Sequence, residues 1–223
     1  MPSPSEPLFE TLGIHPRLAQ QLRFLREIDA LKEVWRKTYL LDGKRFENDA
    51  EHSWEMAVMA AILVDYLPAG ADLHRIILML LIHDLVEINA GDTFAYDEAA
   101  IQGQAEREQR AAEQLYGLLP ADQGAEFRAL WDEFEARQTA DAKFARAIDR
   151  LQPLLHNYQT QGKAWQEHGV KASQVRKIMT VIGDASPELG DLADKLIGDA
   201  VTQGYLADDS AGAPYRCIRS PSY

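Results

Sequence analysis

The chain has 223 residues, of which 46% are hydrophobic and 26% charged, as in a globular protein with one domain and a core of ordinary size. Its net charge of −12 argues against binding long nucleic acid, which needs a basic face to neutralise phosphates. Cys217 is the only cysteine, which excludes an internal disulfide and a cysteine zinc site, and neither a signal segment nor a membrane-length apolar run is recognised. We therefore expect a cytoplasmic protein that binds neither nucleic acid polymers nor membranes.

Three parts are expected along the chain. Residues 1–14 open with a proline-rich and serine-rich stretch, which predicts a flexible N-terminus. Residues 15–206 carry the apolar stripes of one helical domain, and residues 207–223 are expected to form a C-terminal tail. Within the domain, apolar residues at spacings of three and four from Leu18 to Val34 predict a first amphipathic helix of about five turns.

A basic stretch follows this helix and surrounds a turn predicted at residues 41–45. Its four basic residues stand out in an acidic protein, and they are Arg36, Lys37, Lys44 and Arg45. The stretch is either a solvated loop or a set of cations that meets an anionic ligand.

The second helix is expected to begin at Asn48 or Asp49, since either residue suits an N-cap, and to reach Tyr66. It places His52 near its first turn. A histidine in that position is either a capping or surface residue or, in the company of other donors, a metal ligand.

The most informative stretch is an apolar helix predicted over residues 73–89 and ended by Gly91. His83 and Asp84 interrupt it where the pattern calls for more apolar residues, so both are expected to be buried, and buried charge needs a partner such as a metal ion. On a helix Glu87 shares their face one turn further on. The alternative is a hydrogen-bonded His–Asp pair in the core with Glu87 at the surface. Asp92, in the following loop, is either a site residue or an ordinary turn aspartate.

The remaining sequence predicts further helices and no strand. Apolar stripes or helix-forming runs indicate them at residues 106–119, 127–134, 144–155, 175–182 and 189–206. Asp149 lies within one of these stripes, where an aspartate needs an explanation. The simplest is a salt bridge to Arg146 or Arg150. The fold class is therefore all-α.

Four residues on these helices form a set of candidate metal ligands: His52, His83, Asp84 and Asp149. Two imidazole nitrogens and two carboxylates suit a divalent transition metal such as Mn²⁺, Fe²⁺, Co²⁺, Ni²⁺ or Zn²⁺ and leave positions for water and a substrate oxygen. This donor set is typical of a catalytic site, whereas a structural zinc site more often uses cysteines and a closed shell.

The set resembles the signature of the HD-domain phosphohydrolases, which is a His, then His-Asp, then a distant Asp on successive helices. The likeness covers roughly Leu31 to Tyr158 and is closest to the bacterial 5′-deoxynucleotidases and their eukaryotic relatives. Its most specific segments are Ala-Glu-His-Ser at 50–53 and the run from His83 to Asp92. The resemblance implies a single-domain HD-domain helical bundle.

The resemblance also implies roles for single residues. The four candidate ligands match the family's metal ligands, Glu87 matches the acid or base beside the attacking water, and Asp92 matches a carboxylate close to the sugar and the leaving oxygen. Arg36 matches, inexactly, an arginine that contacts the nucleotide, because Trp35 precedes it where the relatives have a Trp soon after it. Lys37 and Arg45 are expected to help neutralise phosphate.

No histidine lies between Asp84 and His156, an interval from which relatives with two metals draw additional ligands. We therefore expect one divalent transition metal, Mn, Co, Fe, Ni or Zn, with Mg as an alternative. Relatives tend to be dimers, so the resemblance implies a homodimer.

The leading hypothesis is metal-dependent hydrolysis of a phosphate monoester, a (deoxy)nucleoside 5′-monophosphate, to nucleoside and phosphate. The alternatives are a nucleoside triphosphohydrolase or phosphodiesterase of the same superfamily, or a non-catalytic nucleotide-binding helical module with a vestigial metal site. The presence of both Glu87 and Asp92 favours the enzyme.

Overall fold

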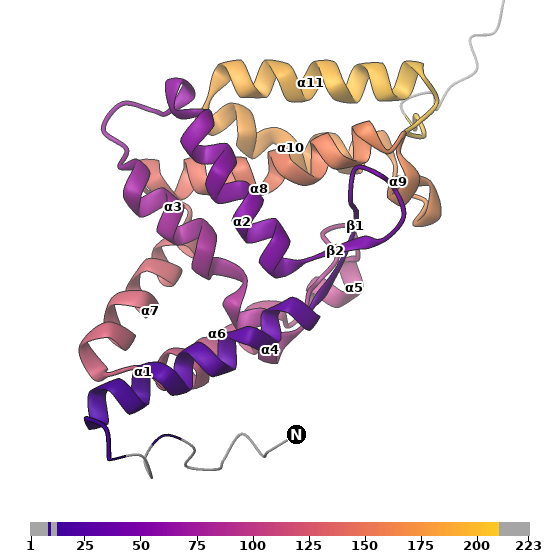
Figure 1. The fold of residues 1–223 in the computed structure, drawn as a ribbon. Helices are drawn as coiled ribbons and strands as arrows, with labels where there is room; N and C mark the ends of the chain where they lie inside the picture. Colours follow the sequence, from indigo (N-terminus) through magenta and orange to yellow (C-terminus); the bar gives the residue numbers. More distant parts are fainter. Residues whose placement is uncertain (1–8, 10–12, 210–223) are drawn as a thin grey trace, which may run out of the picture.

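The structure is a computed structural model that describes residue 9 and residues 13–209 (Figure 1). Helices dominate this part of the chain, which confirms the predicted all-α class. The α-helices are α1 (Pro16–Glu27), α2 (Asp49–Ile62), α3 (Leu73–Ile82), α4 (Glu87–Ala90), α5 (Glu98–Ile101), α6 (Gln104–Tyr116), α7 (Ala121–Ala136), α8 (Ala140–Gln159), α9 (Lys163–Glu167), α10 (Ala172–Ala185) and α11 (Pro187–Thr202). Most of the predicted flexible N-terminus and of the predicted tail lies outside the described residues.

The N-terminal part differs from the sequence prediction in three places. The second helix does not reach Tyr66, because α2 ends at Ile62 and a separate 3₁₀-helix, η3 (Val64–Tyr66), follows. The first helix changes at Ile28 from α1 into a 3₁₀-helix, η2 (Ile28–Glu33), and does not continue to Val34. A two-stranded antiparallel sheet follows, β1 (Trp35–Tyr39) paired with β2 (Phe46–Asn48), although no strand was predicted. Strands of three to five residues are too short to show a convincing alternation. The predicted turn at 41–45 is confirmed, since it joins the two strands with Gly43 at φ +66°.

The helix that carries His83 is broken where the sequence predicted continuity. It becomes the 3₁₀-helix η4 (His83–Val86) before α4 begins. The Tyr116 hydroxyl donates to the Ile82 carbonyl at 3.1 Å, and Trp131 Nε1 donates to the His83 carbonyl at 3.1 Å. The Glu87 amide accordingly donates to the carbonyls of Asp84 and Leu85. In an α-helix it would donate to the His83 carbonyl instead. Two buried side chains from α6 and α7 therefore stabilise the break.

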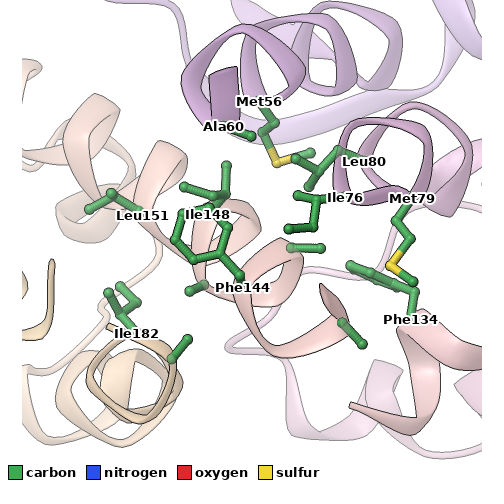
Figure 2. Close-up of a cluster of buried hydrophobic side chains, with 14 of the residues drawn as sticks. Met56, Ala60, Ile76, Met79, Leu80, Phe134, Phe144, Ile148, Leu151 and Ile182 are labelled. Carbon is green, nitrogen blue, oxygen red and sulfur yellow. The ribbon is translucent and has the colours of Figure 1, made fainter. Parts of the chain in front are cut away.

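The core is built around α8, which contacts α2, α3, α7, α10 and α11. Figure 2 shows Phe144 and Ile148 of α8 among apolar side chains of neighbouring helices. These side chains include Met56 of α2, Ile76 and Leu80 of α3, Phe134 of α7 and Ile182 of α10. Tight packing on every side holds Asp149, the residue after Ile148, in a defined position. In the described part of the chain, no helix has the length and apolar character needed to cross a membrane.

Candidate metal centre

The four predicted ligands come from three elements that meet beside the core. His52 lies one turn into α2, behind a capping box in which the Asn48 side chain accepts from the Glu51 amide at 2.9 Å. His83 and Asp84 open η4, and Asp149 lies midway along α8. All four side chains are buried, as the sequence predicted for His83 and Asp84.

The donor atoms of this cluster converge. Asp149 Oδ1 lies 3.3 Å from His52 Nε2 and 3.8 Å from His83 Nε2. Asp84 closes the cluster, with Oδ1 2.9 Å from His83 Nε2 and Oδ2 4.0 Å from His52 Nε2. One ligand atom from each of His52, His83 and Asp149 falls within 4.8 Å of the others. The structure thus brings together four residues spread over almost 100 positions of sequence.

Both imidazoles are oriented by bonds behind them. His83 Nδ1 lies 3.0 Å from the Leu80 carbonyl, and His52 Nδ1 lies 3.0 Å from Gln152 Oε1. The Gln152 amide nitrogen donates to Glu47 and Glu55, each at 2.8 Å, which leaves its oxygen as the acceptor for His52. When a ring is neutral, it therefore carries its proton on Nδ1 and presents the Nε2 lone pair to the cluster, the arrangement found in metal-binding histidines.

The cluster has the electrostatics of a cation site. His83 Nε2 is buried and has no hydrogen-bond partner, although Asp84 lies within 2.9 Å. Burial lowers the pKa of His83, but the Asp84 and Asp149 carboxylates outweigh it and raise that pKa to about 10. A site that draws a proton this strongly also attracts a metal ion, and its nitrogen and carboxylate donors fit a divalent transition metal.

Asp149 meets both of its predicted partners. Its Oδ2 lies 2.8 Å from Arg146 Nη1 and 3.5 Å from Arg150 Nε, while Oδ1 faces the two histidines. The salt bridge and the contact with the histidines therefore coexist on opposite carboxylate oxygens. Burial raises the pKa of Asp149, but Arg150 and Arg146 outweigh it and hold that pKa well below its usual range.

Glu87 belongs to a second group of carboxylates, with Asp49 and Asp92. One oxygen from each lies within 4.8 Å of the others. Glu87 is buried, so it does not lie at the surface as the alternative interpretation required. Burial and then the neighbouring Asp84 raise the pKa of Glu87 well above its usual range and the pKa of Asp49 to about 7. This group therefore holds protons that isolated carboxylates would lose.

Asp49 is a site residue that the sequence analysis missed. It was considered only as a possible N-cap, but Asn48 caps α2, and Asp49 is fully buried with its side chain directed inward. A usable signal exists, because Asp49 precedes His52 by three residues and so shares its helix face.

The three predicted substrate-binding cations lie in different surroundings. Arg36 is surrounded by four carboxylates. Its Nη1 lies 3.1 Å from Asp84, 3.2 Å from Asp49 and 3.9 Å from Asp92. Its Nε lies 3.2 Å from Glu47. Lys37 is exposed and lines the cleft described below. Arg45 lies outside the cleft lining and pairs with Glu51 at 2.6 Å.

A cleft opens onto the cluster, and its lining includes His83, Asp84 and Asp149. Aromatic and apolar side chains also line it, namely Phe94, Tyr96, Pro153 and Met179. It continues into a second hollow, the charged extension, which shares part of its lining and has these polar and charged side chains: Gln104, Glu108, Glu135, Arg137, Arg146, Arg150 and Lys177. None of the residues in these two sets was predicted to bind substrate.

Comparison with known proteins gives consistent results. A family model described as HD domain matches residues 28–190. The crystal structure of a predicted metal-dependent phosphohydrolase from Magnetospirillum magnetotacticum MS-1 superposes with a TM-score of 0.83 at 54% identity, covering 86% of this chain and 96% of that one. The human protein named 5′-deoxynucleotidase HDDC2 is 33% identical over 135 residues, or 60% of this chain.

The match to the human protein extends over 65% of its length, slightly under two thirds. A more distant structure, the HD domain-containing protein YGK1, has a TM-score of 0.53 at 15% identity and covers 85% of this chain and 90% of that one, so it supports the fold alone.

Proposed function

Because the chain belongs to the HD domain family, we propose that it is a metal-dependent phosphohydrolase that cleaves a phosphate monoester, a (deoxy)nucleoside 5′-monophosphate, to nucleoside and phosphate. The observation that carries this proposal is the convergence of His52, His83, Asp84 and Asp149, the last three of which line a cleft. The printed names of the relatives support it, since one is a predicted metal-dependent phosphohydrolase and another a 5′-deoxynucleotidase.

The four ligands would hold one divalent transition metal, Mn, Co, Fe, Ni or Zn, with Mg as an alternative. When bound, such an ion supplies a nucleophilic water at neutral pH and polarises the phosphoryl group. The protein contributes the orientation of the ligands: Gln152 and the Leu80 carbonyl hold the two imidazoles, and Arg146 holds Asp149.

Proton transfer is assigned to the carboxylate group beside the ligands. Glu87 and Asp92 both line the cleft, whereas Asp49 is fully buried and is not part of the lining. Burial raises the pKa of both Glu87 and Asp92, so this group can keep a proton for the leaving alkoxide near neutral pH. Arg36, one guanidinium among four carboxylates, fixes their relative positions.

The remaining expectations stay predictions. The homodimer and the cytoplasmic location rest on resemblance and composition. Within the superfamily, a triphosphohydrolase would release tripolyphosphate and a phosphodiesterase would open a cyclic nucleotide, so product analysis separates both from a monophosphatase. A non-catalytic module would bind nucleotide and release nothing.

The test is orthophosphate release from a panel of ribo- and deoxyribonucleoside monophosphates. Protein stripped of metal is resupplied with Mn²⁺, Co²⁺, Ni²⁺, Zn²⁺ or Mg²⁺, with Asp84→Ala as the site variant and Asp132→Ala, on the exposed side of α7, as the matched control. We expect release that requires added metal, is lost in Asp84→Ala and persists in Asp132→Ala. Silence across the panel in protein that demonstrably holds metal would refute the monophosphatase.

A further inference from the structure

Two of the three cations expected from the sequence to bind phosphate are already paired with carboxylates. Arg36 faces four carboxylates within 4 Å, so one positive charge is more than neutralised. Arg45 forms its ion pair with Glu51 outside the cleft lining, at 2.6 Å. Lys37 lines the cleft but is exposed, so a largely buried source of positive charge for a phosphate group has to be sought among other residues.

Arg146 and Arg150 supply that charge. They lie four residues apart on α8, hence on one face, and both line the cleft and its charged extension. Their side chains are only 16% and 17% exposed. Among the described residues they share one carboxylate, Asp149, and no hydrogen bond joins Arg150 to any acceptor. Two largely buried arginine side chains thus face one carboxylate, whose other oxygen faces the two histidines.

The surroundings do not cancel this excess. Of the two other acidic side chains in the charged extension, Glu135 lies 3.5 Å from Arg137 and Glu108 accepts from the Gln104 amide. Lys177 adds a further positive charge at the rim. In a chain of net charge −12, this wall of the cleft therefore has a local positive excess.

We propose that Arg146 and Arg150 form the phosphate-binding site of the cleft. Guanidinium groups bind phosphate through paired N–H donors, and partial burial strengthens those bonds relative to water. Arg146 is further held in place over the Phe134 ring, 5.9 Å from its centroid. The inference rests on the proposed function for the identity of the substrate, but the site can be tested with inorganic phosphate alone.

The competing explanation is that the two arginines only hold Asp149 in position for the metal. The two roles predict different losses. An anchor affects metal affinity, whereas a phosphate site affects phosphate affinity even when every metal site is filled.

The experiment measures inorganic phosphate binding by calorimetry to Mn²⁺-loaded protein. The variants are Arg150→Met, Arg150→Lys and, as matched control, Arg110→Met, an exposed arginine of α6 paired with Glu106. Each protein is first titrated with Mn²⁺ to obtain its Mn²⁺ dissociation constant. Phosphate is then titrated in buffer that holds free Mn²⁺ at about ten times this constant, so that the metal site is filled in every variant. Circular dichroism confirms the fold, and Arg150→Lys retains the charge if the Met variant unfolds.

We expect phosphate affinity to fall at least about tenfold in Arg150→Met, less in Arg150→Lys, and not in Arg110→Met. Equal phosphate affinity in wild type and both Arg150 variants, or no phosphate binding by the wild type, would overturn the proposal. If nucleotides are not hydrolysed but phosphate binding depends on Arg150, the inference stands and the monophosphatase does not. If nucleotides are hydrolysed but phosphate affinity does not depend on Arg150, the monophosphatase stands and the inference does not.

Discussion

The two sides of the metal cluster carry opposite excesses of charge. On the side built by β1, β2, the start of α2, η4 and the loop after α4, one arginine, Arg36, lies among four carboxylates. On the α8 side, Arg146 and Arg150 lie around one carboxylate, Asp149. The four proposed metal ligands lie at the boundary between these two sides.

This asymmetry separates two chemical tasks. Carboxylates crowded together in a buried place retain protons, so the acidic side suits proton transfer to a leaving group. Arginines with too few counter-ions have donors left for a ligand, so the α8 side suits an anion. On this view Arg36 has a structural role on the acidic side, whereas Arg146 and Arg150 on the α8 side are available to bind substrate.

The strongest test of the comparison is the stability of metal-free Arg36→Met against metal-free Arg150→Met. Removing Arg36 leaves buried carboxylates uncompensated, and we expect a loss of about 3–5 kcal/mol in the free energy of unfolding. Removing Arg150 leaves Arg146 paired with Asp149 and removes the repulsion between the two arginines. We therefore expect the free energy of unfolding to change by less than about 1 kcal/mol. Urea denaturation followed by circular dichroism measures both. Equal losses would show that the two sides are not different.

Loss of a proposed metal ligand should have the next largest effect. His83→Ala removes the buried Nε2 atom that we propose as a metal ligand. We expect Mn²⁺ affinity to fall by more than about 100-fold, because loss of a residue that only hydrogen-bonds to a ligand already costs about 10–100-fold. The matched control is His74→Ala, an exposed histidine on α3, the helix that leads into η4. Competition with a fluorescent chelator gives both dissociation constants. Unchanged affinity in His83→Ala would place the metal elsewhere.

A smaller loss is expected behind the other histidine. Gln152→Met keeps the volume of the side chain but removes the acceptor for His52 Nδ1 and the donor for Glu47 and Glu55. We expect Mn²⁺ affinity to fall about tenfold, with Gln159→Met, exposed at the end of the same helix, as control. Wild-type affinity in Gln152→Met would mean that packing alone orients His52.

The candidate metal ligands could be singled out from the sequence because their signals are local, and their role as ligands stays a prediction. Apolar stripes set the helices, and His83, Asp84 and Asp149 each interrupt such a stripe. The break at His83 was not predictable, because it depends on Tyr116 and Trp131, which reach its carbonyls from distant helices.

Two further misses have the same origin. The choice between Asn48 and Asp49 as helix cap depends on backbone angles that sequence alone does not give, so Asp49 was overlooked as a site residue. The charge balance of the arginines likewise depends on tertiary structure. Arg36 meets carboxylates from several other elements, whereas among the described residues Arg146 and Arg150 form ion pairs only with Asp149. Residue type indicated cations, but only the fold shows which of them have charge to spare.

The smallest predicted effect concerns the rim of the α8 side. Lys177 is exposed, so its attraction for phosphate acts through water and is screened by salt, whereas Arg150 acts from a largely buried position. We expect Lys177→Met to weaken phosphate binding about two- to threefold at low ionic strength and not at about 0.5 M salt, while the effect of Arg150→Met persists at both. Lys195→Met, exposed on α11 and outside both parts of the cleft, is the control. If both effects vanish together at high salt, the α8 side attracts anions only as a diffuse field and holds no phosphate in contact with Arg150.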